Sequence, residues 1–373
     1  MANMETIITT IIVNYNSAKL TERAVRSVHD NHVPGYKHEI IVVDNTATES
    51  ERTALESSIS GLANLIVNKT NIGFGSACNI AYEQSHGKYI MLLNPDAFLD
   101  KNALSILINY LSTHPDVGAI SPSAFLDNNK TFFLPSSPYS NPLMLLIEII
   151  ISKVGILQIL GSRYSRVRSY TELTRETPYC KYNLSGGHVL ISRDLINRIG
   201  GLFDPRFFLY YEDTDMFLRI QKLGYKLYIL PDAKVVHNYN QCTPVDRGSK
   251  NRYMAVSFQQ FLHKYDHSGI LMLLLQPVSR LPYTSLFARR KIKDLGILSS
   301  PPQFNVPQKL QSQWILEFGP NLSFTPAALK KGRGPIARID HDTWKLLKPG
   351  QYYARLGGLG FFSKLNIWQW VIE

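Results

Sequence analysis

The sequence predicts an α/β fold: a doubly wound sheet in the first two thirds of the chain, then a helical extension and a small all-β sandwich. Three observations predict this order. Runs rich in β-branched residues alternate with helically patterned segments near the start. A helical pattern occupies residues 246–295, and after residue 299 apolar and polar residues alternate. We therefore expect domains at 1–245, 246–298 and 299–373.

The first third supplies the strands and helices of the sheet. Thr6–Val13 is rich in Thr, Ile and Val, which is typical of a buried strand. The other predicted strands are Ile40–Val43, Leu65–Val67, Tyr89–Leu93 and Val117–Ile120. The predicted helices are Ala18–His32, Ser76–Ser85 and Ala103–Ser112. Because helices separate the strands, we expect parallel pairing and a ligand beyond the carboxyl ends of the strands.

Polar residues follow four of these strands. They are Asn14-Tyr15-Asn16, Asp44-Asn45, Asn68 with the loop Asn71–Gly75, and Asn94-Pro95-Asp96. Turns commonly use Asn, Asp and Gly, which explains any one group without a function. Their coincidence at one edge favours a binding site. No GxGxxG follows the first strand, and no GxxxxGK followed by Ser or Thr occurs, so ordinary dinucleotide and P-loop chemistry are excluded.

The charge of the chain is unevenly distributed. The 373 residues include 40 Lys or Arg and 29 Asp or Glu, a formal net charge of +11. Residues 1–135 hold 9 basic and 13 acidic residues (−4), whereas residues 136–300 hold 22 and 12 (+10). A uniformly basic chain would indicate a nucleic-acid partner. This distribution indicates instead that one surface of the middle segment meets an anion.

Cysteine use and the N-terminus favour a cytoplasmic protein. Cys78, Cys180 and Cys242 lie far apart and form neither a disulfide framework nor a CxxC motif, which suits a reducing compartment. Residues Met1–Thr10 lack the pattern of a signal peptide.

The apolar run Leu143–Leu160 is interrupted by polar residues such as Glu148, so we expect no membrane-spanning helix there. A wide apolar face followed by basic residues is typical of a helix lying on an anionic membrane surface. Those basic residues are Arg163, Arg166 and Arg168. Burial of the helix against the main domain is the alternative.

The segment that carries most chemistry lies between Ser185 and His237. Glu212, Asp213 and Asp215 stand at the start of a predicted helix, directly after the aromatic run Phe207–Tyr211. The helix dipole favours acids in a first turn, which explains some of them without a function. A carboxylate held in a half-buried site can also take a proton from an attacking hydroxyl group.

Taken together, these motifs resemble those of the family 2 glycosyltransferases with the GT-A fold, close to the rhamnosyltransferase-like branch. The likeness spans about residues 6–240. It is carried by Val13-Asn14-Tyr15-Asn16, Val42-Val43-Asp44-Asn45, the loop Asn71–Gly75, Leu92-Leu93-Asn94-Pro95-Asp96, Gly186-Gly187, Phe203-Asp204 and Glu212-Asp213. The range 1–245 would then be the GT-A catalytic domain.

The resemblance implies an inverting transfer from a nucleoside-diphosphate sugar. Asp213 would be the general base, and Glu212 and Asp215 would bind or orient a sugar. The implied nucleotide-sugar contacts are Asn14, Tyr15, Asp44, Asn71, Gly73, Asn94 and Asp96, and the implied acceptor contacts are Gly186 and Gly187. Asp96 and His237 would hold a divalent cation, Mg²⁺ or Mn²⁺, on the diphosphate. For His237, a structural role at a strand edge is the alternative.

One departure from the family pattern bears on donor and metal. Asn94 stands at the first position of the Asp-x-Asp motif, where a carboxylate is usual. Because hard cations prefer carboxylates and phosphate oxygens, the ion would depend on Asp96 and the bound diphosphate. The Asn-Pro-Asp variant favours dTDP-rhamnose as donor, with UDP-sugars and other dTDP-sugars left open.

The last third predicts a β module after a linker at Ser299–Pro302. Alternation places Trp314, Leu316 and Phe318 on one strand face, and Trp368, Trp370 and Ile372 likewise. The run Pro349–Tyr353 resembles part of a fibronectin type III module. Its tryptophans would either form the core of the sandwich or stack on sugars.

The leading hypothesis is therefore a glycosyltransferase that extends a lipid-linked or cell-surface glycan in polysaccharide biosynthesis. It would act at the inner face of the plasma membrane as a peripheral protein, and nucleic acid is not an expected partner. One alternative is a sugar nucleotidyltransferase, which would need a glycine-rich loop at the first turn. The other is a glycan-binding protein without activity, which loss of Asp96 or Asp213 would have indicated.

Overall fold

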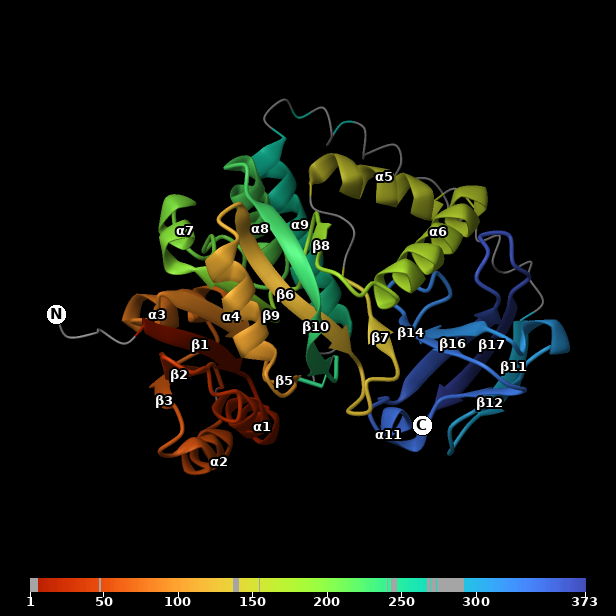
Figure 1. Ribbon diagram of the computed structural model, residues 1–373, viewed down its shortest axis with the longest axis horizontal. Helices are drawn as coiled ribbons and strands as arrows, with labels where there is room; N and C mark the ends of the chain where they lie inside the picture. The colour runs from red at the N-terminus through yellow and green to blue at the C-terminus, as the bar shows by residue number, and fades with distance from the viewer. Residues whose placement is uncertain are drawn as a thin grey trace. The chain divides into compact units, whose positions relative to one another are not determined.

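The computed structural model describes residues 6–46, 48–136, 141–153, 155–239, 241–242, 247–266 and 292–373, together with Gly269 and Leu273 (Figure 1). Contacts divide the chain into two compact units. Unit 1 comprises Met1–Ser123, Ser136–Met144 and Glu176–Leu271, and unit 2 comprises Ala124–Pro135, Leu145–Arg175 and Met272–Glu373. This division differs from the predicted ranges, because residues 124–135 and 145–175 belong with the C-terminal part of the chain.

The centre of unit 1 is a set of parallel strands, as the sequence predicts. They are β1 (Thr6–Asn14), β2 (Tyr36–Asp44), β3 (Asn64–Val67) and β4 (Tyr89–Leu93), in the order β4-β1-β2-β3. The register pairs Asn14 with Asp44, and Asp44 with Val67. The polar residues that end these strands therefore lie at one level, at the carboxyl edge of the sheet.

The sheet is mixed and not wholly parallel, which corrects the prediction. β9 (His188–Ser192) lies between β4 and β6 (Val117–Phe125) and runs antiparallel to both. β10 (Lys226–His237) runs antiparallel to β5 (Ala97–Leu99) and to β8 (Tyr179–Lys181). The physical reason is that β9 and β10 pair with strands far away in the sequence, Val189 with Leu92 and Val235 with Leu99, so their direction is set by long-range pairing and not by local pattern.

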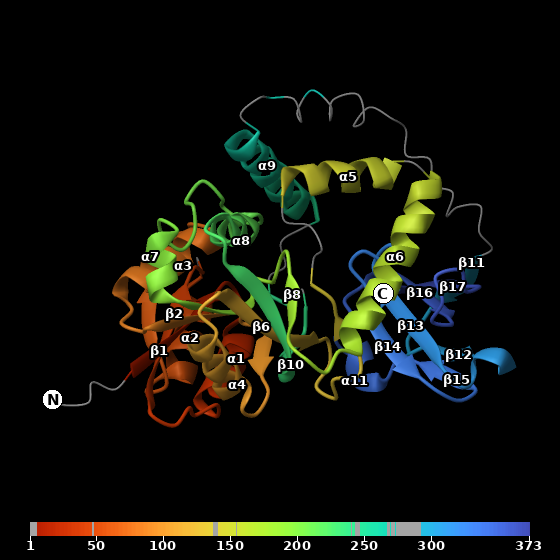
Figure 2. The same cartoon turned by 45° about the horizontal axis from the view of Figure 1, so that its top comes forward.

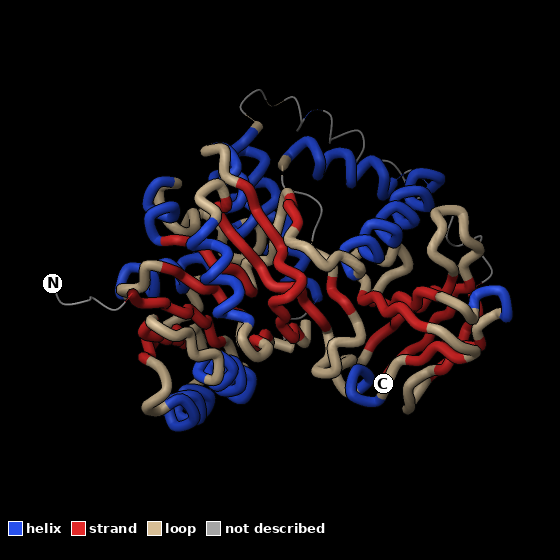
Figure 3. Tube along the Cα trace, viewed as in Figure 1, coloured by secondary structure: helices blue, strands red, loops and turns tan. Residues whose placement is uncertain are grey.

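Helices follow the strands along unit 1 (Figure 3). They are α1 (Ala18–His29), α2 (Glu49–Ile59), α3 (Phe74–Gln84), α4 (Ala103–Thr113), α7 (Arg193–Arg198), α8 (Glu212–Lys222) and α9 (Arg247–Tyr265). The predicted helices correspond to α1, α3 and α4. Helix α9 confirms a helix in the first part of 246–298.

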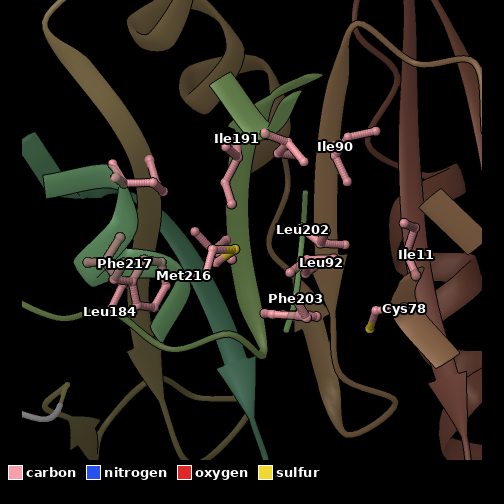
Figure 4. Close-up of a cluster of buried hydrophobic side chains, with 14 of the residues drawn as sticks. Ile11, Cys78, Ile90, Leu92, Leu184, Ile191, Leu202, Phe203, Met216 and Phe217 are labelled. Carbon is pink, nitrogen blue, oxygen red and sulfur yellow. The ribbon is translucent and has the colours of Figure 1, made fainter. Parts of the chain in front are cut away.

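A core of apolar side chains fixes α8 against the sheet (Figure 4). Met216 and Phe217 of α8 are fully buried, in one cluster with Ile11, Leu92 and Ile191 of the strands. Burying a side chain of this size contributes about 1.5–3 kcal/mol. The anchored helix places its acidic first turn at a defined position in unit 1.

The strands of unit 2 follow the order β11-β17-β16-β13-β14-β7. Its strands are β7 (Phe133–Leu134), β11 (Ile292–Ile297), β13 (Trp314–Gly319), β14 (Ala328–Gly332), β16 (Gly350–Gly357) and β17 (Asn366–Ile372). A two-stranded sheet joins β12 (Gln303–Asn305) to β15 (Ile336–Arg338), and η2 (Gln308–Leu310) and α11 (His341–Trp344) are short helical turns. Residues 292–297, predicted to be helical, form a strand because they pair with β17.

Alternation along β13 separates two faces of the unit 2 sheet. Trp314 and Trp370 are buried in one cluster with Phe304 of β12, so these tryptophans form the core and are not available to stack on sugars. On the other face, Glu317 pairs with Arg166 of α6 (Gly155–Leu173). Figure 2 shows α6 lying across this sheet.

Helix α5 (Pro142–Lys153) precedes α6, and the two helices meet at a bend of 120°. Within the described residues, no single helix is both long and apolar enough to cross a membrane. By length and composition alone, the bent pair Pro142–Ile151 and Ile156–Leu173 meets the criteria together.

Candidate active site

Asn14 and Asp44 lie side by side where β1 and β2 end. Asn14 is fully buried, and its amide nitrogen donates to Oδ1 of Asp44 at 3.0 Å. Its carbonyl oxygen accepts from the hydroxyl groups of Ser17 and Thr21. Asn14 is therefore occupied in orienting Asp44. Tyr15, the next residue, is partly buried.

The second oxygen of Asp44 lacks a hydrogen-bond partner although it is buried. The Nε atom of Arg52 lies 3.6 Å from it, beyond hydrogen-bond distance. A buried carboxylate oxygen without a partner is costly, and sites that await a ligand tolerate this arrangement. Within the described residues, Oδ2 of Asp44 therefore has an ion pair with Arg52 but accepts no hydrogen bond.

Asn45 ties the loop after β3 to the same edge. Its side-chain amide donates to the carbonyl oxygen of Gly73 at 3.1 Å and to Oδ1 of Asn71 at 3.2 Å. Gly73 has φ +88°, and a Cβ there would lie 2.4 Å from the carbonyl oxygen of Phe208. Only glycine fits this position. Asn71 and Gly73 therefore lie together, as the sequence predicts.

Asp96 and His237 meet at the end of β10. His237 Nε2 lies 3.3 Å from Oδ1 of Asp96, and the backbone N–H of Gln241 donates to Oδ2. Burial raises the pKa of Asp96, but the interactions with His237, Gln241 and Cys242 outweigh it and bring the pKa down to about 2. Asp96 is therefore a carboxylate at neutral pH, with an imidazole nitrogen beside it.

Two adjacent glycines connect this corner of the site to α8. The carbonyl oxygen of Gly187 accepts a hydrogen bond from the backbone N–H of Asn94 at 2.8 Å. A Cβ on Gly187 would lie 2.5 Å from the side-chain amide nitrogen of Asn94. The N–H of Gly186 donates to Oδ2 of Asp213 at 3.1 Å. Asn94, Gly186, Gly187 and Asp213 are therefore in direct contact, which brings predicted donor-binding and catalytic residues together.

The three acids at the start of α8 have three different environments. Asp213 accepts hydrogen bonds from the N–H groups of Gly186 and Thr214. Burial raises its pKa above the ordinary value, and these hydrogen bonds limit the rise. Within the described residues, Asp213 has no ion-pair partner, so it can accept a proton without first losing a cation.

Glu212 is buried beside Asp213, and its Oε2 atom lacks a hydrogen-bond partner. Burial and then the negative charge of Asp213 raise the pKa of Glu212 to about 8. At neutral pH this side chain therefore holds a proton.

Asp215 is fully buried and neutralised. Arg219 Nε lies 2.9 Å from Oδ2, Lys264 Nζ lies 2.5 Å from Oδ1, and the hydroxyl group of Tyr265 donates to Oδ1 at 2.6 Å. With both oxygens engaged, this side chain holds α8 and α9 together. A sugar contact through Asp215 stays a prediction.

Sequence reasoning missed several residues that shape this site. Arg219 could have been found, because it stands four residues after Asp215 on the same helix. Asn45 stands in the run Val42-Val43-Asp44-Asn45, which could have identified it as a site residue. Lys264 and Tyr265 carry no local signal, because they lie about fifty residues from the acids they contact.

The donors at Asp96 and His237 suit a divalent cation that is completed by a ligand. Within the described residues no group of three His, Cys, Asp or Glu side chains gathers at ligand distance. Oδ1 and Nε2 are 3.3 Å apart, close to the ~3.0 Å between neighbouring ligands of an octahedral ion at ~2.1 Å. Mg²⁺ is typically held by one or two carboxylates plus phosphate oxygens, and Asp96 supplies one such carboxylate.

Comparison with protein families gives one match that covers just over half of the chain. The family described as "Glycosyl transferase family 2" matches residues 9–200. These residues include β1 to β9, and so Asn14, Asp44, Asp96 and Gly186, whereas Asp213 lies beyond them.

Two curated relatives show similarity at low identity. The chain is 24% identical over 225 residues to the N-acetylglucosaminyl-diphospho-decaprenol L-rhamnosyltransferase of Mycobacterium tuberculosis, a match that covers 56% of this chain and 69% of that protein. It is 27% identical over 113 residues to the putative teichuronic acid biosynthesis glycosyltransferase TuaG of Bacillus subtilis, covering 30% of this chain and 44% of that one.

Two solved structures are also similar. The first is the mannosyltransferase PcManGT of Pyrobaculum calidifontis in complex with GDP-Man and Mn²⁺, with a TM-score of 0.43 and 20% identity over 66% of this chain and 59% of that one. The second is GalNAc-T7 with UDP, GalNAc and Mn²⁺, with a TM-score of 0.46 and 15% identity over 91% of this chain and 68% of that one.

Proposed function

The chain belongs to glycosyl transferase family 2, and from this premise we propose that it transfers a sugar with inversion from a nucleoside-diphosphate donor to a hydroxyl group of a glycan. The chain is a glycosyltransferase of the GT-A type, and nucleotide sugars are the donors of this class. The proposal concerns the stereochemistry, the donor sugar, the acceptor and the roles of single residues.

The observation that carries the mechanism is the environment of Asp213. Among the three acids at the start of α8, Asp213 accepts hydrogen bonds from the backbone N–H groups of Gly186 and Thr214 and lacks a cationic partner within the described residues. Burial raises its pKa above the ordinary value, which is the direction in which enzymes tune a carboxylate for general-base work. Asp213 takes the proton of the acceptor hydroxyl while that oxygen bonds to the anomeric carbon and the bond from this carbon to the diphosphate oxygen breaks.

The residues that follow β1, β2 and β4 would hold the donor, across Gly186 and Gly187 from Asp213. Asp44, whose Oδ2 accepts no hydrogen bond within the described residues, would accept one from the pyrimidine base, with Tyr15 beside it. The loop containing Asn71 and Gly73 lies against the nucleoside. Asp96 and His237 would hold Mg²⁺ or Mn²⁺, which neutralises the charge that builds on the departing diphosphate.

We further propose dTDP-rhamnose as donor and a lipid-linked or surface glycan as acceptor. The support is the Asn94-Pro95-Asp96 run together with the relative named as an L-rhamnosyltransferase that acts on a diphospho-decaprenol. A sequence identity of 24% to this relative supports only the general reaction. The choice of rhamnose as the donor sugar therefore depends on the Asn94-Pro95-Asp96 run. The buried tryptophans of unit 2 give no support to a glycan-binding protein without activity.

A lipid-linked acceptor requires the enzyme to work at a membrane surface. Ile156, Leu160 and Tyr164 stand at successive four-residue spacings on α6 and are exposed. They form an exposed apolar face that suits a membrane surface. The basic residues predicted beside it bond within unit 2 instead: Arg163 donates to the backbone carbonyl oxygens of Phe361 and Ser363, and Arg166 is buried against Glu317. We propose peripheral association with the cytoplasmic face of the plasma membrane, and a likeness of 299–373 to a fibronectin type III module stays a prediction.

Calorimetric titration with dTDP-rhamnose, UDP-glucose and UDP-galactose tests the donor, each with Mg²⁺ and with EDTA. We expect selective binding of dTDP-rhamnose that weakens in EDTA. A preference for a UDP-sugar would contradict the rhamnose assignment and leave the reaction class intact. Failure of all three to bind would contradict the proposed function.

A further inference from the structure

The segment Phe207–Tyr211, which leads into α8, touches both halves of the site. The carbonyl oxygen of Phe208 accepts the backbone N–H of Phe74 at 3.0 Å, directly after Gly73. At its other end the segment continues into Glu212 and Asp213. The donor loop and the proposed base are therefore joined through a few residues of backbone.

This segment has a strained backbone. Tyr210 and Tyr211 have φ values of 72° and 69°, in the left-handed region that bulky side chains rarely adopt. Two such residues in succession are held only where surrounding contacts over-determine the conformation. Contacts to Phe208, Leu209 and Tyr211 come from α9.

One stripe of α9 contacts three residues of this segment. The ring of Tyr253 stacks on Phe208, with centroids 4.9 Å apart, and the hydroxyl group of Ser257 donates to the carbonyl oxygen of Leu209 at 2.8 Å. Phe261, one turn further along, contacts the ring of Tyr211. These three residues of α9 stand at spacings of four, so they share one face of the helix.

The same stripe ends on charged groups. Lys264 bridges Asp204, at 2.6 Å, and Asp215, at 2.5 Å, while Tyr265 donates to Asp215 at 2.6 Å. Asp204 precedes the strained segment and Asp215 follows it, so the two ends are fastened to one lysine. Both Figure 1 and Figure 2 show α8 and α9 side by side.

We propose that Lys264 and Tyr265 are positioning residues: together with the stripe Tyr253, Ser257 and Phe261 they clamp the strained segment, and so set the placement of Asp213 relative to the donor loop at Gly73. This inference rests on the proposed function, in which Asp213 is the general base of sugar transfer. The clamp acts through Asp204 and Asp215 and through the backbone between them.

The kinetic test uses Lys264→Met, which removes the charge, Lys264→Arg, which keeps it, and Tyr265→Phe, which removes one hydroxyl group. We expect kcat to fall roughly 10- to 100-fold in Lys264→Met, less in Tyr265→Phe, and to recover in Lys264→Arg. The dissociation constant of the donor should change by less than about twofold, because the groups that hold the donor remain.

The matched control is Lys226→Met, since Lys226 forms a comparable 2.9 Å ion pair with Asp116 in the same unit, with both side chains more than half exposed. It should leave kcat unchanged. A purely structural role for Lys264 would lower stability in Lys264→Met while kcat of the folded fraction stays normal, and that outcome would overturn the proposal.

Hydrogen exchange of the Phe74 amide gives a readout that does not depend on turnover. That amide is protected by the carbonyl oxygen of Phe208, so loosening the segment should speed its exchange about tenfold in Lys264→Met and in Tyr265→Phe, but not in Lys226→Met. Unchanged exchange in both clamp variants would contradict the clamp. Absence of turnover by the unaltered chain would contradict the proposed function, and the exchange measurement would still decide the inference.

Discussion

The backbone N–H of Gly186 donates a hydrogen bond of 3.1 Å to Oδ2 of Asp213, and a Cβ on this glycine would lie 2.8 Å from the Cβ of that aspartate. The next residue, Gly187, makes the corresponding close approach to Asn94. Two adjacent glycines thus join the proposed general base to the run that ends in Asp96. The two glycines let the backbone pass close to Asp213 and Asn94, because any side chain at these positions would push the two parts of the site apart.

Gly186→Ala should displace Asp213 without altering the groups that hold the donor. A contact of 2.8 Å between two Cβ atoms cannot persist, so the carboxylate must move. We expect kcat to fall roughly 10- to 100-fold, because small misplacements of a catalytic group have effects of this size. Steady-state kinetics and donor titration measure the two quantities separately.

Gly360→Ala is the matched control, since a Cβ at Gly360 would meet nothing within 4 Å. A Gly186→Ala enzyme with normal kcat would show that the close approach to Asp213 does not matter for the reaction.

Glu212→Gln should change how stability depends on pH. The folded chain keeps a proton on Glu212 up to a pKa of about 8, because of burial and then Asp213, whereas the ordinary value is 4.5. Between these values the folded state binds more protons than the unfolded state, so the free energy of unfolding falls as pH rises. Glu212→Gln has no such proton to lose. Between pH 5 and pH 9, its free energy of unfolding should therefore rise by up to ~4 kcal/mol relative to that of the unaltered chain.

Denaturant unfolding at pH 5, 7 and 9 measures this difference. Glu83→Gln, at an exposed position of α3, is the control and should follow the unaltered chain. If the curves of Glu212→Gln and the unaltered chain run parallel across this range, Glu212 does not carry the proton.

Asp96→Asn should weaken the binding of donor in Mg²⁺ while leaving binding in EDTA unchanged. The carboxylate, whose pKa lies at about 2 because His237, Gln241 and Cys242 outweigh the effect of burial, is the charged group nearest the proposed ion. We expect the dissociation constant in Mg²⁺ to rise about tenfold or more, since hard cations depend on charged oxygen ligands. Asp116→Asn is the control, and equal titration curves for Asp96→Asn and the unaltered chain would contradict a role for Asp96 in metal binding.

Glu317→Gln should destabilise unit 2. Both Arg166, through Nε at 2.9 Å, and Arg355, through Nε at 2.6 Å, pair with Oε2 of Glu317, and all three side chains are buried. Removing the negative charge leaves two buried guanidinium groups without compensation, which costs about 3–5 kcal/mol. Denaturant unfolding checks this, with Asp294→Asn on the exposed strand β11 as the control. A loss of unfolding free energy below about 1 kcal/mol would show that Glu317 is not needed to compensate the charges of the two arginines.

The parallel strands and the residues that end them could be predicted because each carries its own signal. The β-branched run of β1 and the fully buried run of β4 identify strands without reference to the rest of the chain. Polar residues after such strands must lie at one edge, so Asp44 and Asp96 could be predicted as site residues. The antiparallel placement of β9 could not, because it depends on partners about one hundred residues away in sequence.

The parts of the site that stayed hidden are those held by distant contacts. Asp215 looks like its two acidic neighbours in the sequence, yet Lys264 and Tyr265 make it a buried, neutralised anchor. Glu212 holds a proton because of burial, which the order of residues does not reveal. Helix α2 was missed because only Leu55 and Ile59 of its residues are buried, too few to produce a helical pattern.

The most direct test of the account is the rate of sugar transfer by Asp213→Asn compared with that of the unaltered chain, together with donor titration on both. The side chain keeps its size and loses its ability to take a proton. We predict a fall in kcat of about 10²–10⁴ with donor affinity retained. Turnover within a few-fold of the unaltered chain would contradict the assignment of Asp213 as the general base.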